Sequence, residues 1–345
     1  MEMTIKGINE GNLNAWFATH IEGAEPPLQF SLITGGHSNL TFKVEDTQGS
    51  IFVLRRPPTG AVIATAHDME REHRIVSALA STDVPVPSAL GLCEDVSVNE
   101  APFYVMNFVE GYVLNDSEVT AKKFDLIQRK RIGEEVVDTL AALHGVAPEA
   151  VGLEKLGRTE NYIPRQLKRW KTQWEKTKTR ELPTMDIVYE GLQSGVPEQK
   201  VSGIVHGDYR LGNMLTRADG HIAAVLDWEL CTLGDPLADL GYIMNNWTSE
   251  EESDMVVGSA ASLPTAAGGF LSREEFISRY EEATGFDTRE IDYYRAFQYW
   301  RLAAIVEGVL SRYKKGVMGG KADTAAFEAQ VNGMAESARL MLDKP

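Results

Sequence analysis

The stretches HGDYRLGN and LDWE carry side chains that suit a reaction assisted by a divalent cation. The first contains His206, Asp208 and Asn213, and the second contains Asp227 and Glu229. Amide and carboxylate oxygens are ligands that Mg²⁺ accepts, and the ion takes its other oxygens from water and phosphate groups. A further carboxylate beside such a site can receive the proton of an attacking hydroxyl group. These residue types therefore favour phosphoryl transfer.

The chain between these residues is predicted to form a hairpin. NMLT and HIAAVLD have the composition of short strands, and ADG supplies a turn through Asp219 and Gly220. Residues that face each other in a hairpin have position numbers with a nearly constant sum, which places Asn213 opposite Asp227. We predict that both oxygen donors lie at its open end, with Asp208 on the entering loop. The alternative, in which HGD and DWE only cap turns, leaves their joint spacing without a cause.

The elements near the N-terminus are predicted to be short strands and a helix. LTFKV alternates apolar and polar residues, and SIFVLRRPP is a strand that its prolines end. A helix follows over DMEREHRIVSALA, and Glu72 falls on its apolar stripe. A buried carboxylate needs a cation, and Arg55 at the end of the preceding strand is the candidate. In the alternative, Glu72 borders the stripe and reaches water.

The rest of the chain reads as a second, mainly helical region. APFYVMNFVEGYVL is predicted to be a buried strand that leads into a linker near Gly111. FDLIQRKRIGEEVVDTLAALHG has apolar residues at helical spacing and ends on Gly145, a candidate C-cap. The prediction is an α+β chain with a small strand-rich lobe over 1–110, a hinge at about 106–110, and a larger helical lobe over 111–345.

Composition limits the partners and the compartment. A hydrophobic fraction of 43% favours a packed core, and a net charge of −16 argues against a nucleic-acid surface. No apolar stretch approaches the length of a membrane span, and the N-terminus lacks the features of a signal peptide. The two cysteines, Cys93 and Cys231, are too few for a disulfide framework. We expect a cytoplasmic protein without nucleic-acid or membrane partners, and the oligomeric state is left open.

HGDYRLGN resembles the H-x-D-x-x-x-x-N catalytic loop of the protein-kinase-like superfamily, and Gly207 makes it most similar to the aminoglycoside phosphotransferase branch. LDWE stands where protein kinases have DFG. FVLRRPP, REHRIVSAL, FYVMNFVEG, RQLKRWKTQW and YWRLAAIVEGVLSRY look closer still to the kinase-like domain of acyl-CoA dehydrogenase family members ten and eleven and of their stand-alone bacterial relatives. The resemblance covers nearly the whole chain and implies a bilobal protein-kinase-like fold with a small antiparallel-sheet N-lobe.

The resemblance implies catalytic roles for residues of the second lobe. Asp208 would be the base, on a loop that His206 helps to shape, and Asn213 and Asp227 would hold Mg²⁺. Arg210 would touch the transferred phosphate or, in the alternative, form a surface salt bridge.

Two further acidic residues have implied roles as well. Asp239 would brace the catalytic loop from below. Glu229 would make a water-mediated contact to the metal or, in the alternative, face solvent or serve as a cap.

The same resemblance places the nucleotide on the first lobe. TGGHSN, with Gly35, Gly36, Ser38 and Asn39, would cover the phosphates. Arg55 stands where kinases have a lysine, which keeps the charge and changes the geometry, and Glu72 would pair with it.

The hinge would receive the purine. Met106 would lie behind the ring, and Asn107 and Val109 would offer backbone groups to its edge, although core packing accounts for Met106 equally well. The implied cofactors are ATP, with GTP left open, and Mg²⁺.

The acceptor is predicted to be a small hydroxylated molecule, and the relatives imply a hydroxyacyl-CoA or a related hydroxy acid. A basic stretch interleaved with Trp170 and Trp174 could meet the phosphates of CoA and stack on its adenine, and its members are Arg165, Lys168, Arg169 and Lys171. Trp228 is another candidate substrate contact. In the alternative, this segment is a helix with a solvated basic face. An aminoglycoside or another amino-alcohol is the competing acceptor, and a nucleotide-binding regulator without transfer activity is the competing class.

Overall fold

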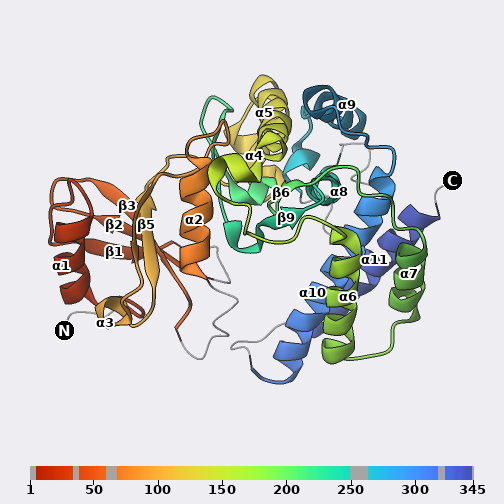
Figure 1. The fold of residues 1–345 in the computed structure, drawn as a ribbon, viewed down its shortest axis with the longest axis horizontal. Helices are drawn as coiled ribbons and strands as arrows, with labels where there is room; N and C mark the ends of the chain where they lie inside the picture. Colours follow the sequence, from red (N-terminus) through yellow and green to blue (C-terminus); the bar gives the residue numbers. More distant parts are fainter. Residues whose placement is uncertain (1–4, 34–38, 60–67, 249–262, 318–322, 344–345) are drawn as a thin grey trace. The chain divides into compact units, whose positions relative to one another are not determined.

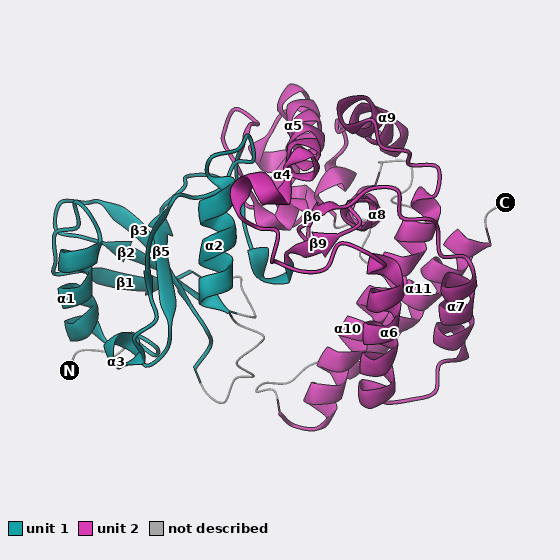
Figure 2. Cartoon of the chain, in the orientation of Figure 1, with its two compact units in different colours: residues 1–111, 223–230 teal, residues 112–222, 231–345 magenta. Residues whose placement is uncertain are grey.

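The computed structural model describes residues 5–33, 39–59, 68–248, 263–317 and 323–343. The chain forms two compact units, shown in separate colours in Figure 2. Unit 1 comprises Met1–Gly111 and Ala223–Leu230, and unit 2 comprises Tyr112–Ile222 and Cys231–Pro345. The functions that the sequence assigns to the two lobes stay predictions.

Unit 1 is built on one antiparallel sheet with the strand order β1-β2-β3-β5-β4. Its strands are β1 (Gln29–Leu32), β2 (Leu40–Glu45), β3 (Ile51–Arg56), β4 (Ala89–Cys93) and β5 (Phe103–Asn107). Its helices are α1 (Glu10–His20), α2 (Met69–Leu79) and the short α3 (Val96–Asn99). Figure 1 shows α1 and α2 on opposite sides of this sheet.

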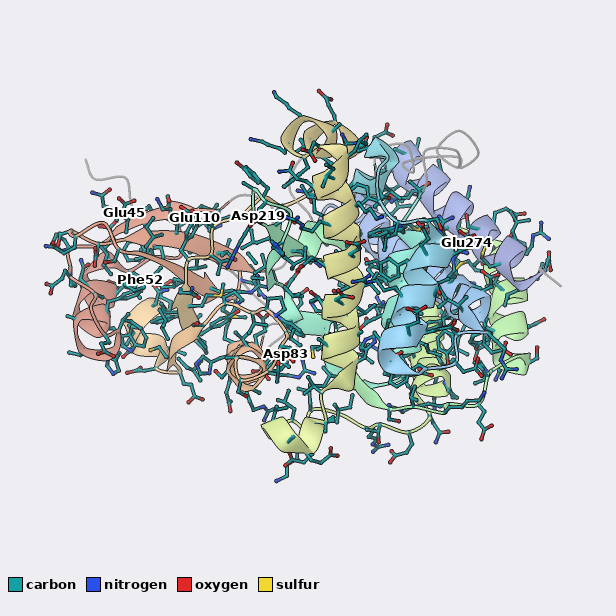
Figure 3. The ribbon with its side chains drawn as sticks, turned by 90° about the horizontal axis from the view of Figure 1, so that it is seen from above. Glu45, Phe52, Asp83, Glu110, Asp219 and Glu274 are labelled. Atoms are coloured by element: carbon teal, nitrogen blue, oxygen red, sulfur yellow. The ribbon has the colours of Figure 1, made fainter. Side chains whose placement is uncertain are left out.

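The alternation of side chains along β3 decides what each face of the sheet does. Phe52 and Leu54 pack into a core that includes Trp16 and Phe17 of α1 (Phe52 is labelled in Figure 3). Val53 points the other way and packs with Met69 of α2 and with residues of β5. Because successive side chains of a strand alternate, Arg55 shares the face of Val53 and is directed toward α2.

Helix α2 confirms the predicted stripe. The side chain of Asp68 caps the helix by accepting a hydrogen bond of 2.9 Å from the backbone N–H of Arg71. The buried residues of the helix are Met69, Glu72, Ile75, Val76 and Leu79. Glu72 is therefore a carboxylate on the inward face of an otherwise apolar stripe, as predicted, and does not reach water.

Unit 2 is mainly helical. Its helices are α4 (Ser117–Lys123), α5 (Leu126–Gly145), α6 (Tyr162–Thr177), α7 (Pro183–Ser194), α8 (Leu237–Asn245), α9 (Arg273–Thr284), α10 (Ile291–Lys314) and α11 (Thr324–Leu342). Helix α10 packs against α6, α8 and α11 (Figure 1). Gly145 is the last helical residue of α5 and Val146 is its cap, so Gly145 is not the predicted C-cap.

Short strands and turns flank the candidate loop. Strands β6 (Gly203–Val205) and β9 (Thr232–Gly234) pair antiparallel, and β7 (Met214–Thr216) forms a two-stranded sheet with β8 (Ile222–Val225). The predicted turn is confirmed, because Arg217 N–H donates to His221 O at 2.8 Å and Gly220 has φ +93°. Asp219, labelled in Figure 3, accepts from His221 N–H within it.

The strands of this hairpin are shorter than predicted. Asn213 belongs to the 3-10 turn η2 (Leu211–Asn213), and β8 ends before Asp227. Asp227 has φ +66°, a left-handed conformation outside the range of regular strands. Asn213 lies in unit 2 and Asp227 in unit 1, so the cation that they were predicted to share stays a prediction.

No helix among the described residues is long and apolar enough to cross a bilayer.

Candidate active site

In unit 1, Arg55 lies between two carboxylates. Its Nε donates to Oε2 of Glu72 at 2.8 Å, and its Nη2 donates to Oδ1 of Asp227 at 2.5 Å. The predicted pairing of Arg55 with Glu72 is therefore confirmed. The planar fork of arginine makes both contacts at once, which the single ammonium of lysine could not do in the same geometry.

Glu72 has further partners that hold it in one orientation. The Tyr104 hydroxyl donates to Oε2 at 3.2 Å, and Asn39 Nδ2 donates to Oε1 at 3.0 Å. Asn39 Nδ2 also lies 3.2 Å from an oxygen of Glu229. The sequence pointed to Asn39 as a phosphate contact and did not identify Tyr104. The signal for Tyr104 was its register, because it stands directly opposite Arg55 in the sheet.

Burial and charge act against each other in this cluster. Burial alone would lower the pKa of Arg55, but Glu72, Tyr104 and Asp227 hold it above its ordinary value. Burial raises the pKa of Glu72, and the Arg55 guanidinium opposes that rise without cancelling it. The guanidinium is thus cationic at any physiological pH.

Asp227 is the member of this cluster that can make another contact. Its side chain is 31% exposed, whereas that of Glu72 is 2% exposed. Arg55 occupies Oδ1, which leaves Oδ2 as an oxygen that can face a cation. The left-handed φ of Asp227 is a conformation that non-glycine residues adopt rarely and often at functional sites.

The other predicted nucleotide-binding residues differ in their burial and in their contacts. Met106 is buried in β5 and packs with Val53 and Met69. Asn107 Oδ1 accepts from Ser88 N–H at 2.6 Å, and Val109 is half-buried beyond the strand. Contacts of these residues to a purine stay proposals.

Three members of the predicted phosphate-covering loop cannot be placed. Gly35, Gly36 and Ser38 lie outside the described residues.

In unit 2, the Asp208 carboxylate is oriented by donors on both oxygens. The Tyr242 hydroxyl donates to Oδ1, and Asn213 Nδ2 donates to Oδ2 at 2.7 Å. Asn213 Nδ2 also donates to the Asp208 carbonyl at 2.9 Å, so its amide oxygen is the end that can face a cation. The Asp208 side chain remains 23% exposed, and Arg210 Nε lies 3.5 Å from Oδ1.

The backbone before Asp208 is held by Asp239. This completely buried carboxylate accepts from His206 N–H at 2.6 Å and from Gly207 N–H at 2.8 Å, which confirms the predicted brace. Gly207 has φ +86°, a turn that favours glycine. His206 is buried, and its Nδ1 accepts from Asp208 N–H at 3.2 Å, in line with a shaping role.

Hydrogen bonding outweighs burial at Asp239. Burial raises the pKa of this carboxyl, but the bond and charge of His144, the charge of His206 and the Gly207 N–H bring it below its ordinary value. The brace is therefore ionised throughout the physiological range.

Sequence reasoning missed Arg301, which holds the other side of the same loop. Arg301 of α10 is 7% exposed, and its Nη2 donates to the Gly207 carbonyl at 3.0 Å. Its Nη1 donates to Gln298 Oε1 at 2.8 Å, and its Cζ lies 5.5 Å from the ring of Trp170 and 6.0 Å from that of Tyr242. The sequence feature that could have identified Arg301 was a cationic side chain within the apolar run YWRLAAIV.

Arg165 and Arg169, which were predicted to contact the substrate, differ in their neighbours. Arg165 donates from Nε to Glu160 O at 3.0 Å, and the Arg169 guanidinium lies 5.2 Å from the ring of Trp170. Partial burial, followed by the charge of Arg301, lowers the pKa of Arg169.

Two of the predicted aromatic contacts are buried. Trp174 is 1% exposed in the core, so its predicted stacking on a ligand is wrong. Trp228 is buried too and donates to Val225 O at 3.1 Å, which favours a packing role.

The oxygen donors fit a hard divalent cation. Within the described ranges, no group of three or more His, Cys, Asp or Glu side chains could hold a metal ion. Asn213 of unit 2 has an amide oxygen and Asp227 of unit 1 has a carboxylate oxygen, and Mg²⁺ accepts both donor types. That the two residues bind one ion stays a prediction.

Comparisons with known proteins identify relatives over most of the chain. Residues 29–294 match the family described as phosphotransferase enzyme family. Mouse acyl-CoA dehydrogenase family member 10 is 33% identical over 322 residues, which are 93% of this chain and 29% of that protein. Human acyl-CoA dehydrogenase family member 11 is 31% identical over 88% of this chain and 39% of that protein. The chain thus spans well under half the length of these relatives.

Solved structures show the same architecture. A Ralstonia eutropha JMP134 protein, provisionally described as an aminoglycoside phosphotransferase, has a TM-score of 0.82 and 34% identity over 97% of this chain and 98% of that chain. A choline/ethanolamine kinase family protein from Mesorhizobium loti has a TM-score of 0.60 at 16% identity over 97% and 95% of the two chains, which bears on the fold alone. The predicted α+β bilobal kinase-like fold and the predicted resemblance are confirmed.

Proposed function

Because the chain belongs to the phosphotransferase enzyme family, we propose that it transfers the γ-phosphate of ATP to a hydroxyl group of a small molecule. The observation that carries this proposal is the geometry of Asp208. Its carboxylate is partly exposed, its two oxygens are oriented by Tyr242 and Asn213, and the preceding backbone is braced by Asp239. A base needs this combination of a fixed direction and an open lone pair.

In the proposed reaction, Asp208 receives the proton of the acceptor hydroxyl. Each carboxylate oxygen has two acceptor sites, so Oδ1 and Oδ2 each retain one after the bonds from Tyr242 and Asn213. Arg210, 38% exposed beside Oδ1, is suited to neutralise charge on the phosphate in transit.

We also propose that Asn213 and Asp227 hold Mg²⁺ through the oxygens described above. When bound, this ion neutralises phosphate charge. In this scheme Arg55 also holds the Asp227 carboxylate in place through its hydrogen bond to Oδ1.

The preferred acceptor is a hydroxyacyl-CoA or a related hydroxy acid. Two relatives that are 31–33% identical over most of this chain carry acyl-CoA dehydrogenase names, and the basic residues Arg165 and Arg169 on α6 suit an anionic acceptor. An aminoglycoside is the second candidate, because the Ralstonia eutropha structure is 34% identical and bears that description.

A coupled assay of ADP release tests the proposal. Purified protein with Mg²⁺ and either ATP or GTP is offered hydroxyacyl-CoAs, free hydroxy acids and aminoglycosides. We expect the greatest kcat/KM with ATP and a hydroxyacyl-CoA. Preferential turnover of kanamycin-like compounds would favour the second candidate, and tight ATP binding without turnover of any acceptor would contradict the enzyme and favour a regulator.

Asp208→Asn tests the base. We expect kcat to fall by about 10²–10⁴-fold while ATP binding is retained, since the change removes a proton acceptor and preserves shape. Asp219→Asn, the same substitution at the exposed hairpin turn, is the matched control and should leave kcat unchanged. Equal activities of the two variants would exclude Asp208 as the base.

A further inference from the structure

Helices α6 and α10 of unit 2 pack together (Figure 1) and bring two arginines to the ring of Trp170. The guanidinium carbon of Arg169 lies 5.2 Å from the centre of this ring, and that of Arg301 lies 5.5 Å from it. Trp170 is half-buried, and its orientation is held by a hydrogen bond of 3.2 Å from Nε1 to Gln166 Oε1. Two positive charges therefore share one aromatic side chain.

Neither of these charges is neutralised by a carboxylate. Within the described chain, Arg169 and Arg301 form no ion pair, whereas Lys171 of the same helix α6 pairs with Glu175 at 2.7 Å. Burial, followed by the charge of Arg301, lowers the pKa of Arg169. Because arginine stays protonated in proteins, the two guanidinium groups are an uncompensated pair of positive charges.

Both guanidinium groups keep donors that a ligand can reach. Arg169 is exposed, and none of its side-chain N–H groups has an acceptor among the described residues. Arg301 is 7% exposed and donates to the Gly207 carbonyl from Nη2 and to Gln298 Oε1 from Nη1. Its Nε has no acceptor in the described chain, where the one fully buried side-chain nitrogen or oxygen without a partner is Thr216 Oγ1. The Nε of Arg301 therefore keeps contact with solvent.

This pair of charges lies beside the proposed base. Arg301 donates to the carbonyl of Gly207, the residue before Asp208, and its Cζ lies 6.0 Å from the ring of Tyr242. The Tyr242 hydroxyl in turn donates to Oδ1 of Asp208. A group bound at Arg301 is thus separated by one side chain from the carboxylate that would receive the proton of the acceptor.

We propose that Arg169 and Arg301 form a subsite for an anionic group of the acceptor, a carboxylate or a phosphate, and so select anionic acceptors. Such a group receives charge-assisted hydrogen bonds from both guanidinium groups and neutralises them. The same two charges repel the ammonium groups of an aminoglycoside. The inference rests on the proposed function for the presence of a reacting hydroxyl group, but the binding of the anionic group does not require turnover.

The test uses two pairs of hydroxyoctanoyl compounds that differ in charge. One pair is the free acid and its uncharged methyl ester, and the other is the CoA thioester and the pantetheine thioester, which lacks phosphates. Calorimetry measures binding with the nucleotide site filled by AMP-PNP and Mg²⁺, and ADP release with ATP measures turnover. We expect the anionic member of at least one pair to bind about tenfold more tightly than the uncharged member.

The two pairs distinguish the sources of the anionic group. A preference for the free acid over its ester identifies a carboxylate, and a preference for the CoA thioester over the pantetheine thioester identifies a phosphate. Equal affinities within both pairs, or no binding of any of the four compounds, overturns the inference.

Substitutions test the two arginines themselves. The measured quantity is the ratio of the affinity of the anionic compound to that of its uncharged partner. We expect Arg169→Gln and Arg301→Gln each to lower this ratio about tenfold, since each loses hydrogen bonds to a charged group. Arg301→Lys keeps the charge without the planar fork and should recover part of the ratio, and it replaces Arg301→Gln if that variant does not fold.

Arg312→Gln is the matched control. Arg312 is an exposed arginine of the same helix α10, eleven positions after Arg301 and therefore about 16 Å along the helix. Its variant loses the same charge and should leave the ratio unchanged.

The affinity ratio separates ligand binding from structural support. If Arg301 only braces the Gly207 carbonyl, its variants weaken charged and uncharged compounds equally, and the unchanged ratio overturns the inference. A lower ratio in both arginine variants of a protein without turnover supports the inference while the proposed function fails. Turnover with an unchanged ratio in Arg169→Gln supports the proposed function and overturns the inference.

Discussion

In unit 1 the buried carboxylate of Glu72 is matched by a cation, whereas in unit 2 the buried carboxylate of Asp239 is matched mainly by backbone. Glu72 pairs with Arg55 at 2.8 Å and accepts bonds from Tyr104 and Asn39. Asp239 accepts two backbone N–H groups, with His144 Nε2 farther away at 3.4 Å. Both carboxylates lie beside residues that are proposed to act on the phosphate or its acceptor.

Because of this difference, a side chain in the unit 1 cluster can exchange its partner, whereas the backbone groups held in unit 2 cannot. The Arg55 guanidinium holds a buried carboxylate and the half-exposed Asp227, so Asp227 can turn to another cation without leaving Arg55 unpaired. The buried N–H groups at positions 206 and 207 are accepted by the Asp239 carboxylate, and a buried donor that loses its acceptor is costly. We infer that the Arg55 cluster of unit 1 is adaptable and that the loop before Asp208 in unit 2 is rigid.

The largest expected effect comes from removing the backbone brace. Asp239→Ala removes the carboxylate that accepts the buried N–H groups of His206 and Gly207, and the free energy of unfolding should fall by about 4 kcal/mol. Urea unfolding measures the loss, and hydrogen exchange should show faster exchange at His206 and Gly207. Asp239→Asn keeps one acceptor oxygen and is the milder control. A loss below about 1 kcal/mol in Asp239→Ala would show that the loop keeps its conformation without the Asp239 carboxylate.

The next effect comes from breaking the ion pair of unit 1. Arg55→Met leaves Glu72 buried without a cation, which should lower the free energy of unfolding by about 3 kcal/mol. Replacing Glu72 by Met in the same chain should restore much of that loss, because an apolar pair of similar volume has no charge to desolvate. Urea unfolding of both single variants and the double variant gives the coupling. Additive losses would mean that the two residues are not energetically paired.

The smallest effect is expected at Tyr104. Tyr104→Phe removes one hydrogen bond from Glu72, which keeps Arg55 and Asn39, so the free energy of unfolding should fall by about 1 kcal/mol. The same urea measurement compares it with Arg55→Met. If Tyr104→Phe cost as much as Arg55→Met, neutral hydrogen bonds rather than charge would hold Glu72, and the contrast between the units would disappear.

Local patterns predicted the parts of this site that depend on nearby residues. The alternation of β3 and the helical spacing of α2 were enough to place Arg55 and Glu72 on facing surfaces, and the ADG turn was enough to predict the bend between β7 and β8. The end of β8 was missed because the left-handed φ of Asp227 is a property of one backbone position that no composition reveals. Trp174 was misassigned because an aromatic residue at helical spacing has the same pattern in a core as at a binding surface.

By itself, the sequence determined which chemical groups are present, the family to which the chain belongs, and the faces on which Arg55 and Glu72 lie. Those properties follow from residue type and from the short periods of strands and helices. Only the tertiary structure decided that Tyr242 reaches Asp208 across 34 positions and that Arg301 reaches Gly207 across 94. Contacts of that separation depend on how α8 and α10 pack against the loop, and helix packing has many solutions that a single sequence pattern does not distinguish.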